Sequence, residues 1–108
     1  MFVSNHNQGF TMKFENGWMI SVQFSPDHHC SASFDKRPDG KRKQPVGRWA
    51  SDTAEVGIFR ANGSWLKGFG DGGVKGHCNA DEVSGLIAMT ASLPNGIMAD
   101  DGFMMEAI

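Results

Sequence analysis

The 108-residue chain has room for one domain with its own hydrophobic core, and its 40% hydrophobic and 20% charged content is ordinary for a globular protein. No apolar run approaches the roughly 20 residues of a membrane-spanning helix, and two cysteines, Cys30 and Cys78, are too few for a disulfide framework. The N-terminal residues lack the basic and apolar regions of a secretory signal. We therefore expect residues 1–108 to form a single soluble, cytoplasmic domain.

The first predicted element is a hairpin around Asn16-Gly17. Asn-Gly tolerates positive φ at both central positions of a type I′ turn, which predicts paired strands over 10–15 and 18–25. The even-numbered residues then share one buried face; they are Phe10, Met12, Phe14, Trp18, Ile20, Val22 and Phe24. A third short strand is expected from Cys30 to Phe34.

A second hairpin is predicted from the alternation in Thr53–Arg60, where Ala54, Val56 and Ile58 are apolar. The turn Ala61-Asn62-Gly63-Ser64 leads into a partner strand at 65–67, which the following glycines shorten. Val74–His77 adds a brief strand.

One helix is well signalled after the second hairpin. Asn79 and Glu82 form a capping box as N-cap and N3 residues, and an apolar stripe follows at helical spacing until Pro94-Asn95-Gly96 ends it. The stripe consists of Val83, Leu86, Ile87, Thr90 and Leu93. The predicted fold class is α+β: a small antiparallel sheet built from two hairpins, closed by one C-terminal α-helix.

The residues after the helix form an apolar tail at 94–108, rich in Met, Phe and Ile. Such a tail is too apolar for a free terminus, so we expect it to dock on its own sheet or on a neighbouring subunit. The second option predicts a homo-oligomer.

Histidine and cysteine occur together at His28-His29-Cys30 and at His77-Cys78, but their spacing is unlike that of a metal site. Adjacent strand residues point to opposite faces, so neighbours cannot easily ligate one ion. No residue lies in a nucleophile motif, and the glycines of 68–76 lack the order of a phosphate-binding loop. We expect no metal, no cofactor and no enzymatic activity.

A basic loop at 35–51 is the most unusual segment of the chain. Residues 36–48 contain six of the ten basic residues and one acid, so they carry +5 and the rest of the chain carries −7, giving the net −2. Phe34 and Trp49 border the segment. It is either a solvated insertion or a clamp for an anion, because unpaired charges of this density cannot be buried.

In the clamp interpretation, Lys36, Arg37 and Arg48 hold phosphates while Phe34 or Trp49 stacks on a base. Arg60 adds positive charge beside the sheet. Duplex DNA is not an expected partner, because the acidic remainder of the chain repels a long polyanion. A small nucleotide-like anion or an acidic protein partner avoids that repulsion.

Several short segments resemble one group of small bacteriophage proteins. They are Phe14–Trp18 running into Ile20–Phe24, then Ala54–Ile58, Val74–His77, Asp81–Val83 and Leu86-Ile87. The best-characterised members of this group are the anti-Thoeris sponge proteins of the first type. The resemblance implies an oligomeric phage protein of the host cytoplasm that sequesters a cyclic ADP-ribose-like signal, or cyclic oligonucleotides, without cleaving it. The basic loop and the tail lie outside the matching segments.

Two other functions are compatible with the same sequence. A protein-binding inhibitor of anti-CRISPR or anti-restriction type would use the acidic body in a nucleic-acid channel, or dock the basic loop on an acidic partner. A virion accessory protein would co-purify with particles.

Overall fold

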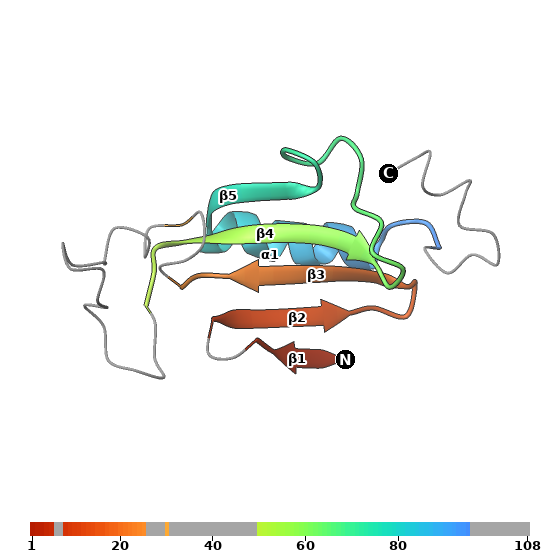
Figure 1. Cartoon of the computed structure of the whole chain (residues 1–108), viewed down its shortest axis with the longest axis horizontal. Helices are drawn as coiled ribbons and strands as arrows, with labels where there is room; N and C mark the ends of the chain where they lie inside the picture. The colour runs from red at the N-terminus through yellow and green to blue at the C-terminus, as the bar shows by residue number, and fades with distance from the viewer. Residues whose placement is uncertain (6–7, 26–29, 31–49, 96–108) are drawn as a thin grey trace.

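Antiparallel strands in sequence order and one helix behind them make up the described part of the chain (Figure 1). The computed structural model describes residues 1–5, 8–25, 30 and 50–95. The sheet has the order β1-β2-β3-β4-β5, and α1 follows β5 directly. The elements are β1 (Phe2–Ser4), β2 (Gly9–Lys13), β3 (Trp18–Gln23), β4 (Thr53–Arg60), β5 (Val74–Asn79) and α1 (Ala80–Ala91). The predicted α+β class is confirmed.

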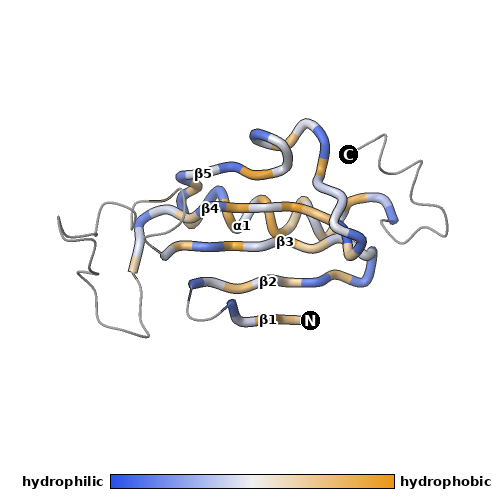
Figure 2. The backbone as a smooth tube through the Cα atoms, viewed as in Figure 1, coloured by the Kyte–Doolittle hydropathy of each residue, from blue (hydrophilic) through white to orange (hydrophobic). Residues whose placement is uncertain are grey.

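The core lies between α1 and the face of β3, β4 and β5 that the helix covers. Trp18, Ile20 and Val22 of β3 are buried there beside Val56 and Ile58 of β4. The predicted burial of alternate residues is therefore confirmed in β3 and β4, and Figure 2 shows the hydrophobic colour along β3, β4 and α1. Burial of such side chains supplies roughly 1.5 to 3 kcal/mol each.

The first turn differs from the predicted type I′ geometry. Gly17 has φ of 88°, but among the described non-glycine residues positive φ occurs at His77 and not at Asn16. Asparagine is suited to this position because of the hydrogen bonds that its side chain makes, not because of its backbone conformation. Its Oδ1 accepts the Trp18 N–H at 3.0 Å, and its Nδ2 donates to the carbonyls of Thr90 at 2.9 Å and Leu93 at 3.1 Å.

The second hairpin has a different partner strand from the one predicted. The turn forms as expected, with the Gly63 N–H bonded to the Arg60 carbonyl at 2.9 Å. The expected strand at 65–67 is reduced to one bridge between Trp65 and Phe59, and β5 provides the ladder for the rest of β4. The glycines that follow Leu66 turn the chain away and back before it pairs again.

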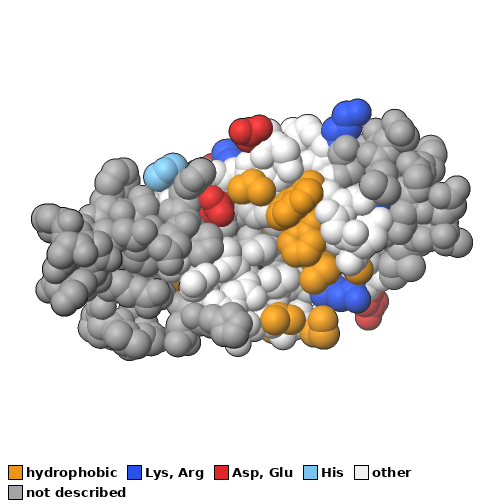
Figure 3. Space-filling model, viewed as in Figure 1, with side chains coloured by type: hydrophobic (Ala, Val, Ile, Leu, Met, Phe, Trp, Pro, Cys, Tyr) orange, Lys and Arg blue, Asp and Glu red, His pale blue; other side chains and the backbone are white. Residues whose placement is uncertain are grey.

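The face of the sheet opposite α1 carries a band of hydrophobic side chains, visible in Figure 3. Trp65 lies on this face with its ring centroid 5.1 Å from that of Phe59. A Cβ at Gly57 would come within 2.8 Å of the Trp65 ring, so glycine at this position allows the indole to lie on the strand. Trp65 keeps 43% of its surface exposed.

Strand β1 was not predicted, because its three residues are too short for a pattern of alternation. It pairs antiparallel with β2, with Val3 opposite Thr11. Three expected features lie outside the described residues: residues 31–34 of the strand expected from Cys30 to Phe34, residues 35–49 of the basic loop and residues 96–108 of the tail. In the part of the chain that is described, no helix has the length and apolar character needed to cross a membrane.

We predict that Asn16→Ala lowers the free energy of unfolding by about 2 to 3 kcal/mol, because it removes three hydrogen bonds, two of them to the carbonyls of Thr90 and Leu93. Asn62→Ala is the matched control. It changes the equivalent Asn-Gly turn, where Oδ1 accepts only the exposed Ser64 N–H among the contacts described, and should cost about 1 kcal/mol. Urea unfolding of both variants measures the difference; equal losses would contradict a special role of Asn16.

Candidate functional site

A groove of about 520 Å³ opens between the sheet and the first half of α1. It lies where β4 begins, where β5 ends and where the helix starts, at the left of the view in Figure 1. The described residues that line it are Val22, Phe24, Ala50, Ser51, Asp52, Thr53, Ala54, Cys78, Ala80, Val83, Ser84 and Ile87. Its volume is within the range of small-molecule sites, roughly 300 to 1,000 Å³.

The interior of the groove is apolar. Val22, Ala54 and Cys78 are core residues that reach it from three neighbouring strands, and Val83 and Ile87 face it from α1. Ala54 and Cys78 are small, whereas the core at the other end of the same strands contains Trp18 and Ile58. The groove therefore follows from the small side chains at this end, which leave space beneath the helix.

The rim of the groove is polar. Ser51 and Asp52, just before β4, and Thr53, its first residue, form one side, and Ser84 stands opposite on the helix. The Ser51 hydroxyl donates to the Thr53 carbonyl at 2.6 Å, which fixes the chain as it enters the strand. Asp52 is exposed and gives this side of the rim a negative charge.

A bulge in β5 positions Cys78 at the groove. Val56 pairs with Lys75 and Ala54 pairs with Cys78, so Gly76 and His77 together stand opposite Glu55. His77 has φ of 54°, a left-handed conformation that is uncommon for a residue with a side chain. The extra residue bends the strand and leads it directly into the helix.

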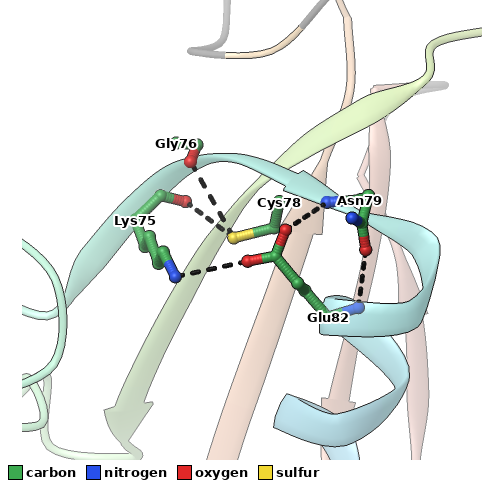
Figure 4. Close-up of polar contacts among 5 residues, drawn as sticks. All are labelled: Lys75, Gly76, Cys78, Asn79 and Glu82. Atoms are coloured by element: carbon green, nitrogen blue, oxygen red, sulfur yellow. Dashed lines mark hydrogen bonds and ion pairs between the residues drawn. The ribbon is translucent and has the colours of Figure 1, made fainter.

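The start of α1 is closed by the predicted capping box, shown in Figure 4. Asn79 Oδ1 accepts the Glu82 N–H at 2.8 Å, and Glu82 Oε1 accepts the Asn79 N–H at 3.3 Å. Glu82 Oε2 also accepts from Lys75 Nζ at 3.3 Å. The Asn79 backbone hydrogen bond, followed by Lys75, lowers the pKa of Glu82. Asp81 and Glu82 place two carboxylates in this first turn, so the helix start disfavours an anion.

Cys78 is a buried thiol and not an activated nucleophile. Its Sγ lies 3.7 Å from the Lys75 carbonyl oxygen and 3.9 Å from that of Gly76 (Figure 4). Burial raises the pKa of Cys78, which Lys75 lowers in part and Glu82 raises further. The thiol is therefore protonated at neutral pH, and nucleophilic chemistry requires the thiolate.

Most of the predicted ligand residues lie outside the described part of the chain. These are Phe34, Lys36, Arg37, Arg48 and Trp49. The last two directly precede Ala50, which lines the groove. The contribution of all five residues to binding stays a prediction.

Arg60 lies at the far end of β4 from the groove. It is separated from Ala54 by about 20 Å at a rise of 3.3 Å per residue. Its side chain is 1% exposed, and its guanidinium carbon lies 6.0 Å from the centroid of the Trp18 ring. Arg60 is not among the residues that line the groove.

The sequence placed Val22, Ala54 and Val83 in the core, and the groove that they line was not predicted. Val22, Ala54 and Val83 follow the alternation and helical spacing of buried residues, so nothing in their pattern distinguishes a wall of a groove. The available signal was size, since Ala54, Cys78 and Ala80 all have small side chains. Among the described residues, no three His, Cys, Asp or Glu side chains gather as a metal site.

Comparison of the chain with protein-family models, curated proteins and solved structures finds no match.

We predict that acid weakens the fold through Glu82. The folded pKa lies below the ordinary 4.5, so the carboxylate stabilises the fold at neutral pH, and this contribution is lost as the pH falls from about 4.5 through the folded pKa. Glu82→Gln keeps a side-chain oxygen for the Asn79 N–H but should flatten this part of the stability profile. Asp81→Asn, which removes a charge from the same helical turn, is the control. Thermal unfolding between pH 3 and 7 compares them, and an unchanged slope in Glu82→Gln would refute the assignment.

Proposed function

We propose that the protein is a phage counter-defence protein of the host cytoplasm that sequesters a nucleotide-derived signal without cleaving it. The ligand class is a cyclic ADP-ribose-like molecule or a cyclic oligonucleotide. The observation that carries the proposal is a groove of about 520 Å³ with an apolar interior, whose rim residue Ala50 directly follows the basic segment. The resemblance of the hairpin, strand and helix segments to the anti-Thoeris sponges supports the ligand class.

The groove suits the base and the sugar of such a ligand. Val22, Val83 and Ile87 offer an apolar surface to a base, and Phe24 at the same site can stack on it. Asp52 and Ser84 at the rim offer an acceptor and a hydroxyl to ribose hydroxyls or to a base amino group.

The phosphates require positive charge that the described lining residues do not supply. Those residues include one acid, Asp52, and no lysine or arginine, while the first turn of α1 carries two further acids, Asp81 and Glu82. The basic segment is the adjacent source in the sequence, since Arg48 precedes Ala50 by two residues. We therefore assign Lys36, Arg37 and Arg48 to the phosphates, with Phe34 or Trp49 stacking on a second base.

Binding without cleavage fits the chemistry of the groove. General acid–base cleavage needs a pair of groups with suitable pKa values in reach of the bond. The described lining offers one carboxylate and a thiol that stays protonated at neutral pH. Binding alone would lower the concentration of free signal in the host, without any cleavage of the molecule.

We predict that Ser84→Trp weakens binding of a cyclic ADP-ribose isomer or cyclic oligonucleotide by tenfold or more, because a large ring on this wall fills the groove. Ala88→Trp, one turn further along α1 and outside the groove lining, is the matched control and should bind like the unmodified protein. Isothermal titration calorimetry measures both, and mass spectrometry of ligand released on denaturation tests that it is intact.

Separate controls distinguish the alternatives. Lys36→Ala, Arg37→Ala and Arg48→Ala together should abolish binding while leaving the unfolding temperature unchanged. The absence of heat for every nucleotide tried would end the proposal, and a stoichiometric host protein in a pull-down would favour the protein-binding inhibitor.

A further inference from the structure

Strand β1 leaves one backbone edge of the sheet open among the described residues. Met1 and Lys13 bond to each other in both directions, at 2.9 and 2.8 Å, and the Asn5 N–H donates to the Gly9 carbonyl at 3.0 Å. Alternation along an antiparallel ladder turns the N–H and C=O groups of Phe2 and Ser4 away from β2. These groups are placed to pair with another strand.

The two edge strands of the sheet, β1 and β5, differ in the features that hinder pairing with another strand. The β5 edge contains Lys75 and the bulge at Gly76 and His77, features that blunt an edge strand against pairing. By contrast, the β1 sequence Phe2-Val3-Ser4 has no charge, proline or bulge. Among the described residues, the shortness of β1 is the one feature that limits pairing at this edge.

The side chains of β1 are apolar and unusually exposed. Phe2 is 76% exposed and Val3 is 40% exposed, and β1 is drawn in hydrophobic colours in Figure 2. Phe2 pairs with Met12, so it stands on the face that α1 covers elsewhere, whereas Val3 stands on the open face opposite Thr11. The helix lies against β3, β4 and β5, and Phe2 is left without its cover.

We propose that β1 pairs antiparallel with β1 of a second copy of this chain, with the two Val3 residues facing each other on the two-fold axis. Each Phe2 then lies opposite the second copy's Ser4, and each such pair exchanges hydrogen bonds in both directions. The hydrogen-bonding groups of the β1 edge therefore match those of a second β1 edge, and the backbone conformation need not change for the two to pair. This inference is independent of the proposed ligand groove.

The pairing joins the two sheets into one and places both copies of α1 on the same face. Between the helices, the floor of the dimer is formed by β1 and β2 of each copy, where Phe2, Phe10 and Met12 lie side by side. The exposed Phe2 surface is therefore gathered at the centre of the dimer and not left at a rim.

The strength of the dimer follows from its size. Burial of an aromatic side chain removes roughly 150 to 250 Å² from water, and β1 offers one such residue per copy. The area buried by the two Phe2 side chains is well short of the roughly 1,200 to 2,000 Å² of a standard stable interface. We therefore expect a reversible, concentration-dependent dimer.

Cysteine cross-linking tests the register. The two Val3 residues form a non-hydrogen-bonded pair with Cα atoms about 4.5 Å apart, a separation that a disulfide can span. Oxidised glutathione should convert Val3→Cys to a disulfide-linked dimer. It should not cross-link Ser4→Cys, because the two Ser4 residues are offset from each other along the paired strands. Cys30 and Cys78 are buried, so the unmodified protein gives the background on a non-reducing gel.

Sedimentation equilibrium tests the association itself. Val3→Lys places like charges opposite each other and should raise the dimer dissociation constant about tenfold or more, while the isosteric Val3→Thr should leave the dimer intact. A monomer at all concentrations, equal cross-linking of Val3→Cys and Ser4→Cys, or a dimer unaffected by Val3→Lys would each overturn the proposal. Circular dichroism confirms that the variants keep the sheet.

Discussion

The attachment of α1 to the first hairpin is the constraint on which the rest of this structure depends. Asn16 binds the carbonyls of Thr90 and Leu93, and the Trp18 indole N–H donates to the Pro94 carbonyl at 2.8 Å. The other end of the helix continues from β5 without a loop. Fixed at both ends, the helix cannot settle onto the small residues Ala54 and Cys78, and the space beneath its first half remains open as the groove.

The sequence predicted the features that depend on neighbouring residues. The capping box of Asn79 and Glu82, the alternation of β3 and β4 and the Asn-Gly turns all follow from local patterns. It missed features that depend on distant contacts. The type I′ turn was expected because the local sequence does not reveal that the Asn16 side chain bonds the carbonyl of Thr90, 74 residues further along the chain. The groove was missed because it results from residue size across three strands and a helix.

The apolar groove and the positive charge of this protein come from different segments of the chain, and the proposed ligand needs both. The described lining provides apolar surface and hydroxyls but no positive residue, while the basic segment that precedes Ala50 carries +5. An amphipathic molecule with a flat base and anionic phosphates needs both parts. The acidic remainder of −7 opposes longer polyanions and so favours a compact ligand over a duplex.

The bond between Asn16 and Leu93 also bears on how the chain folds as it is made. It joins residues 77 positions apart, so the end of the helix can dock only after nearly all the described chain has left the ribosome. The first hairpin can form early from local contacts, but its buried face has no cover until β4 and α1 arrive. During that interval Trp18, Ile20 and Val22 remain open to other chains, which makes this small protein dependent on rapid completion of synthesis.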